Sequence, residues 1–438
     1  MPSKKRILNQ GYQCSLCAAH YAPDEVTYTC PKDGGNLDVV FDYTVINQST
    51  SPEKVMGSSD PSLWRYLPLL PVEDPGFHGT PLRAAGGTPV YAPARLRKRL
   101  GLSRFWIKDE SRNPTASFKD RASAVVVARA LEIGKRTGKT PILVTASTGN
   151  AGAALAGMAA AVGEKAVIFA PRTAPPAKIA QLLIYGAQVL LVDGTYDQAF
   201  DLAILAAQEF SWYCRSTGYN PFTLEGKKTA ALEIWEWLWG GAGNGKDVGR
   251  PNRDPLTHLL STPLHIFVPV GDGNIISGLH KGFKDLHALG WLENMPRLFG
   301  VQAQGSSAIA NAYSTGGETI TSVSAITLAD SISVDLPRDG IRALRAVRQT
   351  GGTFLTVSDT EILLAVAELG KDGIFAEPAG AAAYAGLVKA VHSGQVEPDA
   401  PVLVLNTGSG LKDVKAALQT VPPAPIIEPT LEAVKRFL

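Results

Sequence analysis

Lys119 is the residue of this chain whose surroundings most clearly indicate chemistry. It lies in the polar run 113–121, directly before the apolar stretch 122–128, which predicts a helix with the lysine near its start. A lysine amine forms a Schiff base with an aldehyde only in its unprotonated form, which burial or a neighbouring cation such as Arg121 would favour. Taken alone, Lys119 could be an ordinary surface lysine, so its role depends on three polar loops further along the chain.

The first of these loops opens a predicted helix with the polar residues Ser147, Thr148 and Asn150. Free N–H groups and hydroxyls at a helix N-terminus attract an anion such as a substrate carboxylate. Asn150 could also donate a hydrogen bond to the phenolic oxygen of a cofactor ring. The alternative is a plain helix cap, because Ser, Thr and Asn are common caps in α/β proteins.

The second loop joins the predicted strand 266–270 to the next helix and consists of Gly271, Asp272, Gly273, Asn274 and Ile275. Small residues let successive N–H groups point into one concavity, and the helix dipole favours a phosphate there. The loop lacks the lysine of a nucleotide-binding GxxxxGK[ST] motif. It therefore predicts a site for the phosphate of a cofactor, with a simple strand-to-helix turn as the alternative.

The third loop, residues 406–413, follows the predicted strand 402–405. A hydroxyl here can hydrogen-bond a pyridine nitrogen and leave the ring less positively charged than an aspartate partner would, which suits elimination and replacement reactions. We select Thr407 for this role, with Ser409 as second choice and a glycine-rich connection as the alternative. Upstream, Glu377 precedes a proline that can begin a helix. It could favour the helix start electrostatically or line the site, and we expect the structural role.

A lysine that can bind an aldehyde, a phosphate loop and a hydroxyl for a pyridine nitrogen together predict pyridoxal 5'-phosphate as cofactor and an amino acid as substrate. The composition agrees, because 42 Lys and Arg against 40 Asp and Glu give no electrostatic reason to expect nucleic acid or a membrane surface as partner. We see no signal segment and no apolar run of roughly 18 residues. We therefore expect a cytoplasmic protein.

Three of the four cysteines lie near the N-terminus. Cys14, Cys17 and Cys30, with Asp33 in the place of a fourth cysteine, have the spacing of a zinc ribbon built from two CxxC knuckles. A carboxylate oxygen suits zinc less well than a thiolate does. Zinc binding and a metal-free remnant of a ribbon are both open, and we assign no metal to the functional site.

The rest of the chain alternates short apolar strands with longer helical segments, which predicts an α/β fold with largely parallel sheets. The predicted strands are 105–108, 141–145, 166–170, 187–192, 266–270 and 402–405, and the predicted helices are 151–162, 176–185, 196–210, 229–238 and 359–368. Gly, Asn, Asp and Pro cluster in residues 240–262, which predicts a surface loop.

The runs around Lys119, Ser147, Gly271, Glu377 and Thr407 occur in the same order as in a known family. Over about residues 67–417 the chain resembles the threonine synthases, which are fold type II, or β-class, pyridoxal-phosphate-dependent enzymes. The resemblance implies that Lys119 forms the internal aldimine and moves protons, and that Asn150 binds the ring hydroxyl. It implies a lyase that converts O-phosphohomoserine and water to L-threonine and phosphate.

The chain departs from the family pattern where the substrate phosphate should bind. Family members usually carry an arginine at the position of Thr223, and a hydroxyl cannot copy its bidentate clamp. Lys227, one turn later, could compensate, and Ser409 also replaces the usual His or Asn. Three alternatives therefore stay open: a threonine or serine ammonia-lyase, replacement on O-phosphoserine as in the cysteate synthase relatives, and a non-catalytic module that binds the cofactor or an amino acid.

The resemblance implies a tryptophan synthase β-like architecture of two α/β domains. We expect a large cofactor-binding domain of residues 60–120 and 222–420 and a small domain of residues 121–221. The degenerate zinc-ribbon-like module spans residues 1–50, and residues 421–438 form a C-terminal tail. Open α/β sheets bind ligands at the carboxyl ends of their strands, so we expect the cofactor between the two domains. The family also implies a homodimer.

Overall fold

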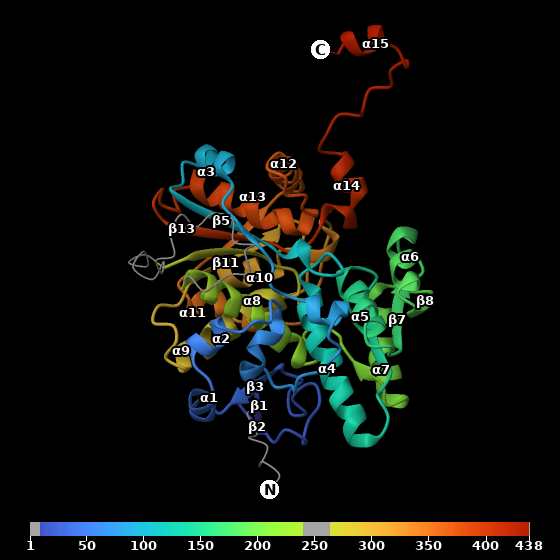
Figure 1. The fold of residues 1–438 in the computed structure, drawn as a ribbon, viewed down its shortest axis with the longest axis vertical. Helices are drawn as coiled ribbons and strands as arrows, with labels where there is room; N and C mark the ends of the chain where they lie inside the picture. Colours follow the sequence, from blue (N-terminus) through green and yellow to red (C-terminus); the bar gives the residue numbers. More distant parts are fainter. Residues whose placement is uncertain (1–8, 240–262, 438) are drawn as a thin grey trace.

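Two mainly parallel β-sheets flanked by helices form the framework of the molecule in the computed structural model, which describes residues 9–239 and 263–437 (Figure 1). This architecture confirms the predicted α/β fold class. The predicted surface loop 240–262 lies outside the described residues.

The larger sheet has six strands in the order β12-β11-β10-β13-β5-β4. The strand bounds are β4 Val90–Tyr91, β5 Arg104–Asp109, β10 His265–Pro269, β11 Arg297–Ala303, β12 Phe354–Val357 and β13 Pro401–Asn406. Every pairing is parallel except that of β4 with β5. All residues of β10 and β13 are buried, as expected for central strands covered on both faces.

The smaller sheet has four parallel strands in the order β8-β7-β6-β9. Its strands are β6 Leu143–Ala146, β7 Ala166–Pro171, β8 Gln188–Val192 and β9 Tyr213–Cys214. The sequence predicts the first three within two residues at each end. It misses β9, which has only two residues, and it misses β4, β11 and β12 of the larger sheet.

The helices cover both sheets, and a separate small sheet lies near the N-terminus. The helix bounds are α1 Tyr43–Ser49, α2 Pro52–Met56, α3 Ala94–Leu100, α4 Lys119–Thr137, α5 Asn150–Ala160, α6 Pro176–Ile184, α7 Tyr196–Glu209, α8 Phe222–Leu238, α9 Asn274–Ala288, α10 Ala308–Ser314, α11 Gly340–Gln349, α12 Asp359–Gly370, α13 Pro378–His392, α14 Val414–Leu418 and α15 Leu431–Lys435. The N-terminal sheet consists of the antiparallel strands β1 Asn9–Cys14, β2 His20–Tyr21 and β3 Leu37–Phe41.

Helix α8 begins at Phe222, seven residues before the predicted start at residue 229. The polar run 223–228 and its glycine obscured the helical pattern. Gly226 has a packing reason, because a Cβ atom there would collide with the main-chain carbonyl of Arg121 on α4. The glycine therefore lets α4 and α8 approach closely behind Lys119.

A buried ion-pair network fastens the start of α4. Arg121 is fully buried, and its guanidinium contacts the carboxylates of Glu110 at 2.7 Å and Glu233 at 2.6 Å. Lys108 donates to Glu233 at 2.8 Å, and Thr229 accepts from Arg121 at 3.0 Å. Arg121 lies two residues after Lys119, so these contacts hold the start of α4 against α8 and strand β5.

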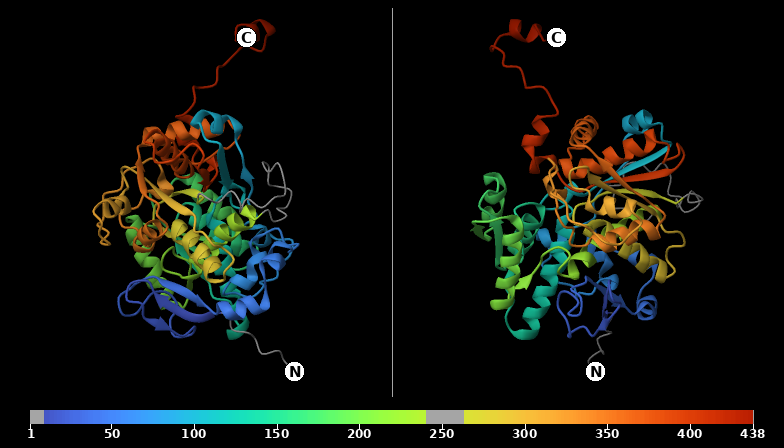
Figure 2. Two further views of the ribbon diagram at one scale, coloured as in Figure 1. Left: turned by 90° about the vertical axis from the view of Figure 1, so that its left-hand side faces the viewer. Right: turned by 180° about the vertical axis from the view of Figure 1, so that it is seen from behind.

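The first and last described elements, β1 and α15, lie at opposite ends of the molecule (Figure 2). The N-terminal sheet lies at one pole of the molecule, and the segment after α14 leaves the body at the other pole and ends in α15. Among the described residues, none of the helices is both long enough and apolar enough to cross a membrane.

Candidate active site

A cavity of about 490 Å³ lies where the carboxyl ends of strands from both sheets face each other. Its walls follow β6, β7 and β9 of the smaller sheet and β10 and β13 of the larger one. All the site residues predicted from the sequence line it: Lys119, Ser147, Thr148, Asn150, Gly271, Asp272, Gly273, Asn274, Ile275 and Thr407. Their roles in binding and catalysis stay predictions.

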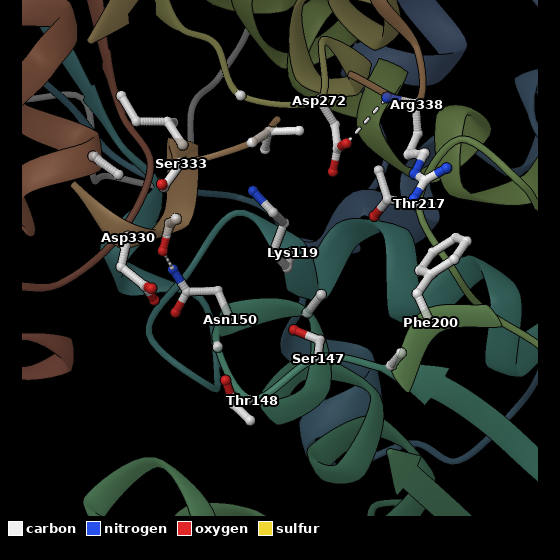
Figure 3. Close-up of a pocket in the computed structure, with 18 of the residues that line it drawn as sticks. Lys119, Ser147, Thr148, Asn150, Phe200, Thr217, Asp272, Asp330, Ser333 and Arg338 are labelled. Atoms are coloured by element: carbon white, nitrogen blue, oxygen red, sulfur yellow. Dashed lines mark hydrogen bonds between the residues drawn. The ribbon is translucent and has the colours of Figure 1, made fainter. Parts of the chain in front are cut away.

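Lys119 is the first residue of α4 and points into this cavity (Figure 3). The turn before it is tied to the loop after β13, because the N–H of Phe118 donates to the carbonyl of Thr407 at 2.9 Å and that of Ser409 to the carbonyl of Ala116 at 3.1 Å. Ala116 adopts a left-handed conformation with φ of 64°. Two of the predicted loops are therefore joined directly through their backbones.

The Lys119 amine lies in an environment that disfavours its charge. Burial lowers its pKa from the ordinary value, and the Arg215 guanidinium acts in the same direction, whereas Glu377 and Asp272 oppose the shift. A lysine with a lowered pKa carries a larger unprotonated fraction at neutral pH. This is the form that attacks a carbonyl carbon.

The loop 271–275 leaves no room for larger side chains. A Cβ atom on Gly271 would lie 2.9 Å from the Cα atom of Ile332, and one on Gly273 would lie 2.7 Å from the carbonyl oxygen of Asp339. Gly273 also has φ of 91°, a conformation that favours glycine. The loop thus presents its backbone at the N-terminus of α9, where N–H groups without a helical partner can bind a phosphate.

The two polar side chains of this loop are held by neighbours. The Asp272 carboxylate accepts the N–H of Arg338 at 3.1 Å, and burial raises its pKa. The Asn274 amide donates to Asp339 at 2.6 Å and accepts from the Lys227 amine at 2.5 Å. These contacts fix the loop from both sides.

Asn150 makes a contact that the sequence did not indicate. Its amide nitrogen donates to both oxygens of Glu377, at 2.8 and 3.0 Å, and lies 3.3 Å from the Ser331 hydroxyl. Glu377 makes no capping hydrogen bond through its side chain to α13, and its role stays a prediction. Burial raises the pKa of this carboxyl, while Asn150 and Lys119 oppose the shift. Glu377 therefore belongs to the surroundings of Lys119.

Sequence reasoning missed a second group of residues that line the cavity. Arg215 and Thr217 follow the short strand β9, and both line the cavity together with Arg338. The Arg215 guanidinium is fully buried and donates to Thr217 at 2.8 Å and to Ser123 at 3.1 Å. The only sequence signal is a polar run after the apolar pair 213–214.

Thr223, by contrast, is not among the side chains that line the cavity. It is fully buried, and its hydroxyl donates to the carbonyl of Asn220 at 2.7 Å. Lys227 does line the cavity, and its pKa lies well below the ordinary value because of burial, with Arg215 and Lys119 acting in the same direction. The Arg215 guanidinium therefore supplies a buried positive charge beside the amines of Lys119 and Lys227, whose lowered pKa values favour their neutral forms.

The fold and this site are those of a fold type II enzyme that uses pyridoxal phosphate, and comparison with known proteins agrees. The family model "Pyridoxal-phosphate dependent enzyme" matches residues 82–408. The lysine with a lowered pKa and the tight glycine loop fit this cofactor, since one can hold its aldehyde carbon and the other its phosphate.

Two curated relatives cover nearly the whole chain. Threonine synthase of Methanosarcina acetivorans is 36% identical over 431 residues, which is 97% of this chain and 98% of that protein. Threonine synthase of Methanocaldococcus jannaschii is 35% identical over 430 residues, again 97% and 98%. The chain therefore belongs to the threonine synthase family of pyridoxal-phosphate-dependent enzymes.

Solved structures of more distant proteins share the fold. Diaminopropionate ammonia lyase from Escherichia coli has a TM-score of 0.63 and 21% identity, covering 85% of this chain and 95% of that chain. Threonine deaminase isoform 2 from Solanum lycopersicum has a TM-score of 0.61 and 21% identity, covering 83% and 90%. At this identity the likeness concerns the fold alone.

Proposed function

We propose that this enzyme converts O-phosphohomoserine and water to L-threonine and phosphate. The observation that carries the proposal is the cavity in which Lys119, with a lowered pKa, shares the lining with the Arg215 guanidinium and the Lys227 amine. The substrate brings one phosphate and the cofactor brings another, so this reaction needs a second anion-binding group such as Arg215 in addition to the glycine loop.

In the proposed reaction the residues of the chain bind the substrate and move its protons. Lys119 holds the cofactor, takes the proton from the substrate α carbon and returns protons to later carbons. Bound pyridoxal phosphate supplies an electron sink for the negative charge that develops at that carbon. Ser147 and Thr148, at the N-terminus of α5, bind the substrate carboxylate. Thr407 would hydrogen-bond the ring nitrogen of the bound cofactor, and the loop 271–275 would hold its phosphate.

Thr223 stands where family members carry the arginine that binds the substrate phosphate. We assign this role to Arg215 and Thr217, with Lys227 nearby. Arg215 lines the cavity, whereas Thr223 does not, and a guanidinium can bind two phosphate oxygens at once. A dianion in this position would favour the protonated form of Lys227, whose pKa is otherwise lowered by burial. The departure from the family pattern at residue 223 is therefore compatible with a phosphorylated substrate.

The remaining parts of the proposal concern organisation. We propose that the small domain, residues 121–221, closes over the large domain, residues 60–120 and 222–420, and excludes water from the cavity. We also propose a homodimer in the cytoplasm, with no nucleic-acid or membrane partner, as the family resemblance and the balanced charge suggest.

The test is a coupled assay of the purified, cofactor-loaded enzyme. With O-phosphohomoserine, phosphate and threonine should appear in equal amounts. Arg215→Met should lower kcat/KM by roughly 30- to 5,000-fold, since truncating a buried charged contact costs about 2–5 kcal/mol. Arg172→Met, at an exposed arginine beside the cavity residue Pro171, is the matched control and should change little. Oxoacid formation from L-threonine or L-serine without turnover of the phosphorylated substrate would instead establish an ammonia-lyase.

A further inference from the structure

The N-terminal sheet carries a cluster of metal-ligating side chains that the reaction does not use. Cys14, Cys17, Cys30 and Asp33 each offer one ligand atom, and these four atoms lie within 4.8 Å of one another. We propose that this cluster binds one Zn²⁺ ion as a closed structural site. The proposal goes beyond the proposed function and does not depend on it.

The distances within the cluster fit a tetrahedral ion. Zinc–sulfur bonds of about 2.3 Å at tetrahedral angles put two sulfur ligands about 3.8 Å apart and a sulfur and an oxygen ligand about 3.5 Å apart. The Sγ atoms of Cys17 and Cys30 are 3.7 Å apart, and Cys14 Sγ lies 3.3 Å from Asp33 Oδ1. Three thiolates and one carboxylate fill four positions and leave none for a substrate, which distinguishes a structural from a catalytic zinc site.

The backbone around the ligands has the form of two facing knuckles. In the first, the N–H of Ala18 donates to the carbonyl of Cys14 at 3.1 Å, and Ala18 has φ of 58°. In the second, the N–H of Gly34 donates to the carbonyl of Cys30 at 2.8 Å, and Gly34 has φ of 71°. The two turns therefore repeat the same geometry, although the second carries a carboxylate where the first carries Cys17.

Neighbouring groups leave space for the cluster and support its charge. A Cβ atom on Gly35 would lie 2.7 Å from Cys14 Sγ and 2.9 Å from Asp33 Oδ1, so a larger residue there would displace the ligand side chains. The N–H of Leu16 donates to Cys14 Sγ at 3.3 Å, and the Tyr21 hydroxyl lies 3.0 Å from Cys30 Sγ. Hydrogen bonds of this kind orient and stabilise thiolate ligands around a metal.

The site also explains how the N-terminal sheet can matter for the cavity. Asn36, in the same loop as Asp33, donates to the main-chain carbonyls of Gly218 and Arg338. Gly218 follows Thr217, and both Thr217 and Arg338 line the cavity. A zinc ion that fixes this loop would therefore support one rim of the cavity without touching a substrate.

Metal analysis of the full-length enzyme, purified without added metal, tests the proposal directly. We expect about one zinc ion per chain, and after exchange a Co²⁺ absorption spectrum of tetrahedral thiolate type. Asp33→Cys should slow zinc transfer to a colorimetric chelator, because a thiolate is the softer ligand, and Asp33→Ala should speed it. Cys214→Ser, at the cysteine outside the cluster, should leave the zinc content unchanged.

Alkylation of Cys17 in the wild-type enzyme is a second test, which does not depend on whether a variant folds. Cys17 is exposed, yet it should resist alkylation in the wild-type enzyme until a chelator is added. Rapid alkylation without a chelator, a Cys17–Cys30 disulfide in the purified protein, or a metal content near background would overturn the proposal. Iron in place of zinc would overturn the choice of metal. None of these readouts requires catalytic activity.

Discussion

Replacement of Arg121 by methionine tests how much the buried ion-pair network beside Lys119 contributes to the stability of the fold. Arg121 is fully buried and donates to Glu110 at 2.7 and 2.8 Å and to Glu233 at 2.6 and 2.7 Å. Without the guanidinium, Lys108 remains as the partner of two buried carboxylates, so one negative charge is left uncompensated. Removing one partner from a buried ion pair costs about 3–5 kcal/mol, and we expect this loss in the free energy of unfolding.

The assay is urea unfolding of the purified enzyme, followed by circular dichroism. The free energies of unfolding are compared with the same dependence on urea concentration for each variant. The control is Arg136→Met on the same helix, where the arginine pairs with Asp24 at an exposed position and should contribute less than about 1 kcal/mol. Adding Glu110→Gln to Arg121→Met should recover at least about 1 kcal/mol, because it removes the uncompensated charge. The reasoning is refuted if Arg121→Met costs no more than the control, or if the double variant loses the sum of the two single losses.

Two further substitutions test particular residues. Thr223→Arg should lower stability by about 1–3 kcal/mol and give no gain in kcat/KM, because Thr223 is fully buried and bound to Asn220; a gain with O-phosphohomoserine would contradict this placement. Burial, with Lys284 acting in the same direction, lowers the pKa of His280 to about 3, so the folded enzyme keeps the ring neutral and loses stability as the pH falls below about 6.5. Between pH 6.5 and 4.5 the free energy of unfolding should fall by roughly 2–3 kcal/mol. This dependence on pH should be weaker in His280→Gln but unchanged in His287→Gln, the exposed control on the same helix. The same dependence in the wild type and in His280→Gln would contradict the prediction.

The meeting of the predicted loops at one cavity could be foreseen from the sequence. Lys119, Asn150, Gly271 and Thr407 lie in four segments far apart in the chain, and three of these segments follow predicted strands. Because the carboxyl ends of parallel strands share one edge of a sheet, polar loops after such strands are brought together. The strong β and helix patterns made this part of the fold predictable.

The contacts that complete the site could not be foreseen, because they depend on packing between distant segments. Asn150 and Glu377 are 227 positions apart, and nothing in either local sequence indicates their hydrogen bond. Arg215 follows a strand of two residues, too short to give a pattern. The position of Thr223 outside the cavity likewise depends on how α8 packs. The sequence predicted this helix only from residue 229, so it did not place Thr223 on a helix.

Borohydride reduction of the cofactor-loaded enzyme, followed by peptide mass mapping, tests the central claim most directly. The cavity contains two lysines, Lys119 and Lys227, so the measurement discriminates between them. The proposed function requires the reduced pyridoxyl group on the peptide that contains Lys119, and its loss in Lys119→Ala. A label on Lys227, or a label that persists in Lys119→Ala, would contradict the account.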